Sequence, residues 1–401
     1  MKILQINTTV NSGSTGRIAE NIGKALMAAG HESTIAFGRG NLPSESRLIR
    51  IGGATNIARH AIHSLLSDRH GFGSPDATRS FIREIENLSP DVIGLHNLHG
   101  YYLNVQVLFS FLRGAGIPVI WTLHDCWAFT GHCAYYDFVG CKKWQHHCHT
   151  CPLTSRYPRS LFRDSSRDNF TDKRNLFSGI DRLKLVTPST WLKNEIAKSF
   201  LSEYDVEVIR NGIDLEMFKI NRTEESGRKL ILGVASTWDR IKGLPDFYHL
   251  RERLPESYDI VIIGASRSLI KKFPRGIQGI ERTENVDELV RWYNAADIFV
   301  NPTYVDNFPT TNLEALACGT PVITYETGGS PEAVDRNTGM VVRRGDIDAL
   351  QAGIKEIVEN GKSAYQESCR ARAQAHFNKD DRFSDYLKLY QSFFPFANGQ
   401  Q

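Results

Sequence analysis

Residues 306–323 read Asp306-Asn-Phe-Pro-Thr-Thr-Asn-Leu-Glu314-Ala-Leu-Ala-Cys-Gly319-Thr-Pro-Val-Ile323. The stretch predicts a loop that leads into a helix, followed after Gly319 by the entry to a strand. A loop, a helix and a strand in this order belong to the repeating units of an α/β protein. The stretch also places two carboxylates, Asp306 and Glu314, eight positions apart across the junction between loop and helix.

The same alternation extends outward over the whole chain. Short apolar runs bounded by turn residues alternate with helical patterns such as Ile18–Ala29, which is typical of parallel sheets. The runs form two sets, so we expect an α/β fold with two Rossmann-like domains. The expected strands are 2–7, 32–37, 92–96, 119–123, 185–188 and 207–209 in the first set, and 229–235, 259–264, 298–302, 321–324 and 340–342 in the second.

Chain length agrees with two domains. A chain of 401 residues exceeds the size at which one hydrophobic core stops growing, so two domains of about 200 residues each are expected. The polar stretch 219–228 reads as a linker, which predicts domains at 1–220 and 221–401. The last helical stretch, 380–394, can pack on either domain, including back on the N-terminal one.

Composition narrows the class of protein. Hydrophobic residues make up 41% and charged residues 23%, which is typical of a globular protein, and a net charge of +3 is too weak to indicate a nucleic-acid partner. The first residues read as a strand rather than a signal peptide, and no run of roughly 18 apolar residues could span a membrane. We therefore expect a cytoplasmic protein, with peripheral contact to an anionic membrane left open.

Two loops carry features that suit a nucleotide sugar. Gly13 and Gly16 lie in a turn before a helix, where backbone amides can approach a phosphate, although a tight turn without a ligand explains them equally well. In the second loop, Glu314 suits a ribose and Asp306 a sugar ring, because carboxylates accept paired hydrogen bonds from neighbouring hydroxyls. The residues between them, Phe308, Pro309, Thr310 and Thr311, would bring backbone groups to the phosphates. The alternative is that Asp306 only caps the helix.

The acidic segment resembles the E-x7-E region of glycosyltransferase family 4, whose members are retaining enzymes of the GT-B fold. The resemblance covers most of the chain and includes the first glycine loop, Thr122–Asp125, Arg210–Asp214 and Lys242-Gly243. The stretch His124–Cys133 is most similar to bacterial enzymes of exopolysaccharide and colanic-acid type. The resemblance implies an interdomain cleft, a nucleotide-sugar donor, and a saccharide or lipid-linked saccharide acceptor in surface-polysaccharide biosynthesis.

Two departures from the family pattern affect the candidate catalytic residues. Asp306 stands where the family has glutamate, and the Gly-Arg-Leu that usually precedes Lys-Gly is replaced by 236–241, where Arg240 is the candidate substitute. Arg240 and Lys242 would neutralise the donor diphosphate and stabilise the leaving group, so catalysis would need no metal ion. The alternative is that both are solvated surface residues.

His124 follows an apolar strand, at the edge where open α/β sheets bind their ligands. We therefore expect it to contact the donor sugar, in preference to a buried structural role. The family implies front-face attack on the sugar, because no enzymic nucleophile is evident.

Five of the seven cysteines fall within the insertion 126–151, and five histidines lie in the same stretch when His124 just before it is included. Cys133, Cys141, Cys148 and Cys151 could bind a structural zinc ion tetrahedrally, but only one close C-x-x-C pair is present. Buried free thiols are therefore an equal alternative.

Two rival functions remain open at this stage. A nucleotide-sugar epimerase of the same architecture would bind a similar donor but form no glycosidic product. A non-catalytic nucleotide-sugar-binding module would keep Glu314 and the phosphate loop without donor cleavage.

Overall fold

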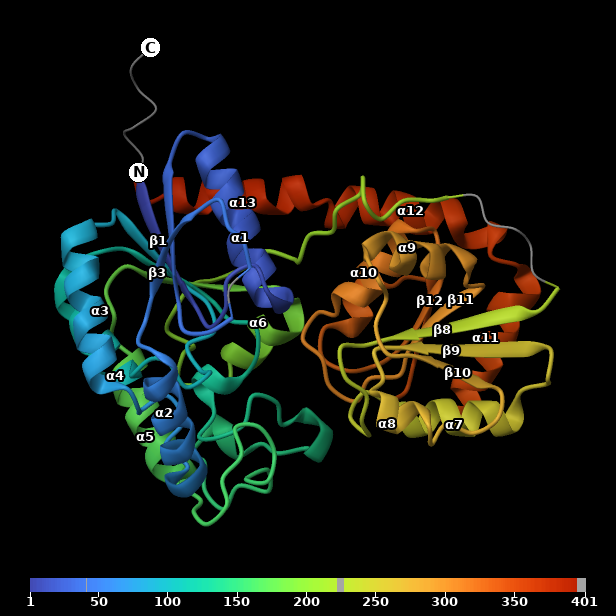
Figure 1. Ribbon diagram of the computed structural model, residues 1–401, viewed down its shortest axis with the longest axis horizontal. Helices are drawn as coiled ribbons and strands as arrows, with labels where there is room; N and C mark the ends of the chain where they lie inside the picture. Colours follow the sequence, from blue (N-terminus) through green and yellow to red (C-terminus); the bar gives the residue numbers. More distant parts are fainter. Residues whose placement is uncertain (41, 222–226, 395–401) are drawn as a thin grey trace. The chain divides into compact units, whose positions relative to one another are not determined.

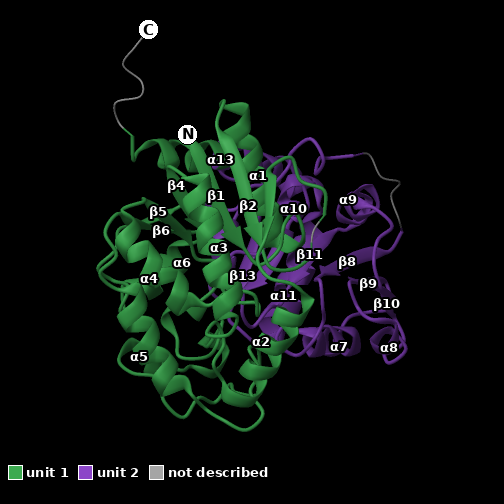
Figure 2. Ribbon diagram, turned by 60° about the vertical axis from the view of Figure 1, so that its left-hand side comes forward, with its two compact units in different colours: residues 1–209, 383–401 green, residues 210–382 purple. Residues whose placement is uncertain are grey.

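The computed structural model describes residues 1–40, 42–221 and 227–394. The chain divides into two compact units, coloured separately in Figure 2. Unit 1 consists of Met1–Ile209 together with the C-terminal residues from Phe383, and unit 2 consists of Arg210–Arg382. Both units are α/β, with a parallel sheet flanked by helices (Figure 1).

The sheet of unit 1 has seven parallel strands in the order β3-β2-β1-β4-β5-β6-β7. Its strands are β1 Lys2–Asn7, β2 Glu32–Phe37, β3 Arg47–Arg50, β4 Val92–Leu95, β5 Val119–Thr122, β6 Leu183–Thr187 and β7 Val206–Val208. Its helices are α1 Gly13–Ala28, α2 Ala54–Ser67, α3 Pro75–Leu88, α4 Val105–Ala115, α5 Ser166–Phe177 and α6 Thr190–Ile196. The insertion after β5 holds only short 3-10 turns, η1 Trp127–Phe129, η2 Asp137–Val139 and η3 Lys143–Gln145.

Burial on both faces explains why the central strands read as continuous apolar runs. Leu4 and Trp121 pack into the core beneath α3 and α4, whereas Ile3 and Ile120 pack on the opposite face. Alternate side chains of one strand therefore enter different cores, which is expected of a parallel sheet covered by helices on both sides.

The last helix, α13 Lys379–Gln391, covers this second face of unit 1 (Figure 1). Its Phe383, Tyr386 and Tyr390 are buried among Ile3, Ile18 and other residues of that core. Gly94 of β4 leaves the space that the Tyr390 hydroxyl fills, since a Cβ there would lie 2.1 Å from that oxygen. Of the two placements open for this helix, the structure shows the one on the N-terminal unit.

Unit 2 contains a six-stranded parallel sheet in the order β10-β9-β8-β11-β12-β13. Its strands are β8 Lys229–Val234, β9 Tyr258–Ile263, β10 Ile277–Ile280, β11 Ile298–Asn301, β12 Val322–Tyr325 and β13 Gly339–Val342. Its helices are α7 Leu244–Arg253, α8 Arg267–Ile270, α9 Val286–Ala295, α10 Thr310–Ala317, α11 Ile347–Asn360 and α12 Ser363–Phe377, with the 3-10 turn η4 Ser330–Ala333.

The observed division at residue 209 lies before the predicted boundary at residue 220. Residues 210–218 belong to unit 2 because Arg370 donates hydrogen bonds to the carbonyls of Leu215 and Phe218, at 2.9 and 2.7 Å. Lys379 also pairs with Asp214 at 2.6 Å. The predicted linker 219–228 falls partly outside the described residues.

Within the described ranges, no helix is both long enough and apolar enough to cross a bilayer.

Candidate active site

The acidic loop of unit 2 lies between β11 and α10. Because α10 begins at Thr310, Asp306 stands in the loop and Glu314 in the second turn of the helix. The Lys242 ammonium lies 2.7 Å from Oδ2 of Asp306, and both side chains keep part of their surface exposed. Two of the predicted catalytic residues are therefore in direct contact, although 64 positions separate them.

The turn that carries Lys242 is fixed by local contacts. Oδ1 of Asp239 accepts the N–H groups of Ile241 and Lys242 at 2.9 and 3.0 Å. Gly243 adopts a φ of +75°, and a Cβ there would lie 2.1 Å from the Pro302 carbonyl oxygen. Only glycine therefore lets this turn approach the end of β11 so closely.

Arg240 lies on the same turn but is exposed and forms no ion pair with any described residue. The structure therefore brings Lys242 to the acidic loop and leaves Arg240 at the surface, so a contact between Arg240 and the donor stays a prediction.

Glu314 is oriented by a buried tyrosine. The hydroxyl of Tyr293 on α9 donates a hydrogen bond to Oε2 of Glu314 at 2.8 Å. Burial and the charge of Glu314 raise the pKa of Tyr293 well above its usual range, so the hydroxyl remains a donor. Glu314 is half-buried, so one end of the α10 carboxylate is fixed by the protein.

At the amino end of α10, the two threonines are partly exposed, whereas Phe308 and Pro309 are buried. Thr310 and Thr311 are half-buried in the first turn, which contains no acidic residue, so its amides favour an anion. Phe308, however, is 3% exposed and packs into the core of unit 2, and Pro309 is also buried. The apolar ring of Phe308 is more stable in the core than in contact with a polar ligand. That the backbone of residues 308–311 approaches the phosphates stays a prediction.

The glycine turn of unit 1 forms the first turn of α1. The helix begins at Gly13, whose φ is +67° and beside which there is open space. Gly16 is buried instead, because a Cβ there would lie 2.8 Å from Oγ1 of Thr9 and 3.2 Å from the Asn11 amide nitrogen. Gly13 thus remains a candidate for close approach by a ligand, whereas Gly16 is required for packing against the preceding loop.

His124 lies just beyond β5 and stacks on a second histidine. The rings of His96 and His124 are 5.5 Å apart and nearly parallel, and His96 Nδ1 is 3.2 Å from His124 Nε2. His96 Nε2 in turn contacts Gln5 Oε1 at 3.1 Å. Burial lowers the pKa of His124 to about 4, so the imidazole is neutral near pH 7 and offers one donor and one acceptor.

Asp125 faces a different histidine. His99 Nε2 lies 2.8 Å from Asp125 Oδ2, and His99 Nδ1 lies 2.9 Å from the Tyr157 hydroxyl. Burial alone would raise the pKa of Asp125, but His99 and the Trp127 amide outweigh burial and lower the pKa. His96, His99 and Tyr157 escaped the sequence analysis, although His96-x2-His99 directly after β4 was a usable signal.

The four cysteines proposed as zinc ligands line one small pocket in the insertion. Cys133 and Cys148 are buried, and Cys141 and Cys151 are half-buried. Among the described residues, however, no three His, Cys, Asp or Glu side chains are arranged to hold a metal ion as they stand. The structure thus brings the predicted set together without forming a coordination shell.

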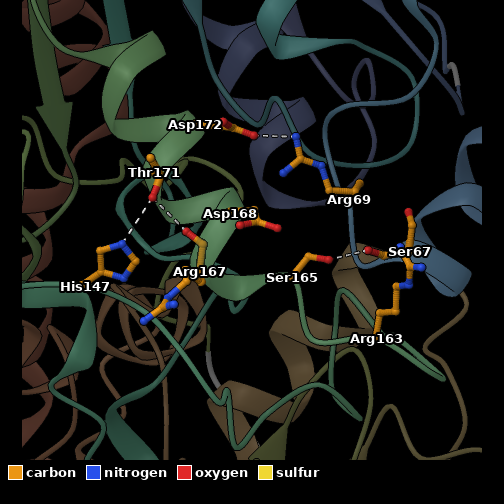
Figure 3. A pocket seen from close by; sticks show the side chains of 9 residues that line it. All are labelled: Ser67, Arg69, His147, Arg163, Ser165, Arg167, Asp168, Thr171 and Asp172. Carbon is orange, nitrogen blue, oxygen red and sulfur yellow. Dashed lines mark hydrogen bonds and ion pairs between the residues drawn. The ribbon is translucent and has the colours of Figure 1, made fainter.

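A larger hollow of about 670 Å³ lies between the end of α2 and the start of α5 (Figure 3). Arg69 points across it to Asp172 at 2.6 Å, and Arg163 and Arg167 are exposed on its wall. The two sides of the hollow come from segments about 100 positions apart in the sequence.

Comparison with known proteins identifies the family. Residues 15–217, half of the chain, match the family model Glycosyltransferase Family 4, and residues 228–360 match Glycosyl transferases group 1. The "Putative colanic acid biosynthesis glycosyl transferase WcaC" of Escherichia coli K12 is 25% identical over 98% of this chain and 100% of its own length.

Solved structures show the same fold. Sucrose-phosphate synthase from Thermosynechococcus elongatus has a TM-score of 0.76 at 18% identity, covering 98% of this chain and 99% of that one. HepE of Anabaena in complex with UDP-glucose has a TM-score of 0.66 at 14% identity, covering 98% and 100%. The chain therefore belongs to glycosyltransferase family 4 and is a glycosyltransferase with the GT-B fold.

Proposed function

We propose that this enzyme transfers a sugar, with retention of configuration and without a catalytic metal ion, from a nucleotide sugar to a saccharide or lipid-linked saccharide in surface-polysaccharide biosynthesis. The observation that carries the proposal is the contact between Lys242 and Asp306 immediately before α10, the helix that also holds Glu314. A cation, helix amides and an oriented carboxylate are the groups that a sugar diphosphate and its ribose require.

Each group has a distinct role in this proposal. Glu314 accepts hydrogen bonds from the ribose hydroxyls, and the first turn of α10 binds phosphate oxygens. Lys242 and Arg240 stabilise the negative charge that develops on the diphosphate as the bond to the sugar breaks. Asp306 and His124 contact the transferred sugar, and the acceptor attacks from the face that the diphosphate leaves.

The names of related proteins support a nucleotide-sugar donor and a role in polysaccharide biosynthesis. WcaC is named for colanic acid biosynthesis, and CapM of Staphylococcus aureus, which is 24% identical over 54% of this chain and 63% of its own length, is named for capsular polysaccharide biosynthesis. HepE has been solved with UDP-glucose. We therefore propose a nucleotide diphosphate sugar as donor.

Nucleotide release by the purified protein tests this proposal. A panel of nucleotide sugars is incubated with the enzyme and a lipid-linked saccharide acceptor, with and without EDTA, and products are separated. We expect release of nucleotide from one donor, a new glycosidic product, and unchanged activity after brief EDTA treatment. Loss of activity that Mg²⁺ or Mn²⁺ restores would contradict metal-independent transfer, and an isomerised nucleotide sugar without glycosidic product would favour the epimerase.

We further propose that the enzyme works at the inner face of the cytoplasmic membrane, where a lipid-linked acceptor is presented. Ile62 and Leu66 of α2 are 57% and 46% exposed, and Phe162 is 78% exposed. The backbone hydrogen bond from Leu161 to Leu65, at 2.8 Å, places the Phe162 segment beside α2. The exposed arginines Arg163 and Arg167 of the neighbouring hollow suit anionic headgroups (Figure 3).

Substitution of Phe162 by aspartate is expected to weaken binding to anionic vesicles severalfold, because it adds a negative charge where an apolar side chain would insert. Co-sedimentation with anionic phosphatidylglycerol vesicles measures the binding. The difference from binding to zwitterionic phosphatidylcholine vesicles gives the electrostatic contribution. Val286→Asp, at an exposed apolar position of unit 2, is the matched control. If both variants bind the vesicles as well as the parent protein does, the surface around Phe162 does not contact the membrane.

A further inference from the structure

The insertion between β5 and α5 has little regular structure to stabilise it. Apart from the three short 3-10 turns, its described residues form no helix or strand from Leu123 to Ser165. Nevertheless, Trp144, Tyr136 and Phe129 are buried and stack on one another. A segment of this kind commonly depends on a cross-link or a metal ion to fix its conformation.

Four cysteines of the insertion line a pocket of about 20 Å³, a volume that suits a single ion or water molecule. Its cysteines are Cys133, Cys141, Cys148 and Cys151. The side chains of Cys133 and Cys151 hydrogen-bond to each other. Cys148 Sγ accepts the N–H of Gly131 at 3.2 Å.

Glycine at position 131 is needed for this arrangement. A Cβ there would lie 2.7 Å from the Cys148 Cβ and 2.1 Å from the Ser166 carbonyl oxygen. Both contacts are too short for any side chain, so the glycine lets the backbone donor reach the sulfur.

A buried histidine in the same pocket points independently to a ligand. His132 is 2% exposed, and its Nδ1 is held by Oδ1 of Asp68 at 2.5 Å. Its other nitrogen, Nε2, is buried and has no partner among the described residues, yet the side chain lines the pocket. Buried nitrogens of this kind are rarely left unsatisfied, and carboxylate–histidine pairs are common around metal centres.

A buried positive charge supplies a third argument. Lys173 of α5 is 1% exposed, and its ammonium donates to the carbonyls of Trp127 and Thr130 at 2.7 and 3.0 Å. It forms no ion pair with any carboxylate in the described part of the chain, and the thiols of Cys148 and Cys133 contribute to its electrostatic surroundings together with Asp125 and Asp68. Four thiolates around a divalent cation leave a net negative charge, which would balance this ammonium.

We propose that Cys133, Cys141, Cys148 and Cys151 bind one Zn²⁺ ion as a structural site, with His132 and Lys173 as polar neighbours of the thiolates. Because the side chains do not yet form a coordination shell, binding turns the four sulfur atoms into the pocket and releases their thiol protons. The ion then cross-links residues 133–151 of the insertion and fixes Tyr136 and Trp144, which lie between the ligands.

Metal content of the full-length chain tests the proposal. Protein purified without chelator is expected to contain about one zinc ion per chain by mass spectrometry. Replacement of the zinc by Co²⁺ should give the intense thiolate charge-transfer bands and visible bands of a tetrahedral sulfur site. This spectrum comes from the unaltered protein, so the result does not depend on whether a variant folds.

Variants then locate the ion. Cys148→Ser and Cys151→Ser are expected to lose most of the zinc and the cobalt spectrum, whereas Cys369→Ser, which removes a buried thiol of unit 2, should keep both. His132→Asn should retain the metal but change the cobalt spectrum. Absence of zinc together with absence of a cobalt–thiolate spectrum would overturn the proposal, as would equal metal loss in Cys369→Ser. A disulfide between Cys133 and Cys151 in freshly purified protein would also overturn it.

Discussion

Replacement of Lys242 by methionine is expected to lower kcat by roughly 10²–10³-fold. The Lys242 ammonium contacts Asp306 at the start of the loop that leads to α10, where the proposed diphosphate gains negative charge as the sugar leaves. Methionine keeps the length of the aliphatic chain but removes the charge. Because the charge matters most in the transition state, kcat should fall more than the affinity for the donor.

Steady-state kinetics with a saturating donor measure this effect, and Lys272→Met supplies a matched control. Lys272 is exposed in the same unit, follows α8 and has no ion pair among the described residues, so its substitution should leave kcat within about twofold. Lys242→Arg should recover part of the activity, since it restores a positive charge. If Lys242→Met keeps full kcat, this residue is not the group that stabilises the leaving diphosphate.

Replacement of Glu314 by glutamine is expected to weaken donor binding by roughly 10–100-fold, the range for loss of a hydrogen bond to a charged group. Glutamine has the same shape and can still accept the hydrogen bond from Tyr293, so the packing of α10 should survive. The loss should therefore appear in the dissociation constant of the nucleotide sugar and in that of the free nucleotide diphosphate.

Isothermal titration calorimetry measures both constants. Glu356→Gln on α11 is the control. Glu356 is exposed, and its substitution removes one negative charge at a position away from the site. Tyr293→Phe should produce a smaller loss, because it removes only the hydroxyl that orients the carboxylate. Unchanged nucleotide affinity in Glu314→Gln would show that the ribose is bound elsewhere.

The central strands were predictable from the sequence because both of their faces are buried. Strands such as β4 and β5 therefore appear as short, largely apolar runs. Strands Arg47–Arg50 and Ile277–Ile280 were missed because neither reads as an apolar run. The first begins and ends with arginine and exposes most of its side chains, and the second is interrupted by Gln278 and Gly279. The attachment of residues 210–218 to unit 2 was not evident from the sequence, because the Arg370 guanidinium binds carbonyls about 150 positions earlier in the chain.

The candidate site was predictable in its residue types but not in its contacts. Spacing alone brought Asp306 and Glu314 to one loop and helix, and the ion pair between Asp306 and Lys242 depends on how β8 and β11 adjoin in the sheet. The position of Phe308 between the two acids did not reveal that its ring packs into the core of unit 2. The stacking of the His96 ring on His124 depends on the fold and cannot be read from the sequence.

The position of α13 has a consequence for biosynthesis. The ribosome makes most of unit 1 first, yet part of the cover on one face of its sheet comes from Phe383, Tyr386 and Tyr390, which are added almost two hundred residues later. The nascent amino-terminal half therefore leaves the exit tunnel with the core around Ile3, Val92 and Ile120 incomplete on that face. Folding of the first half is completed only after the second half has been translated, and chaperones that shield apolar surface have that interval in which to act.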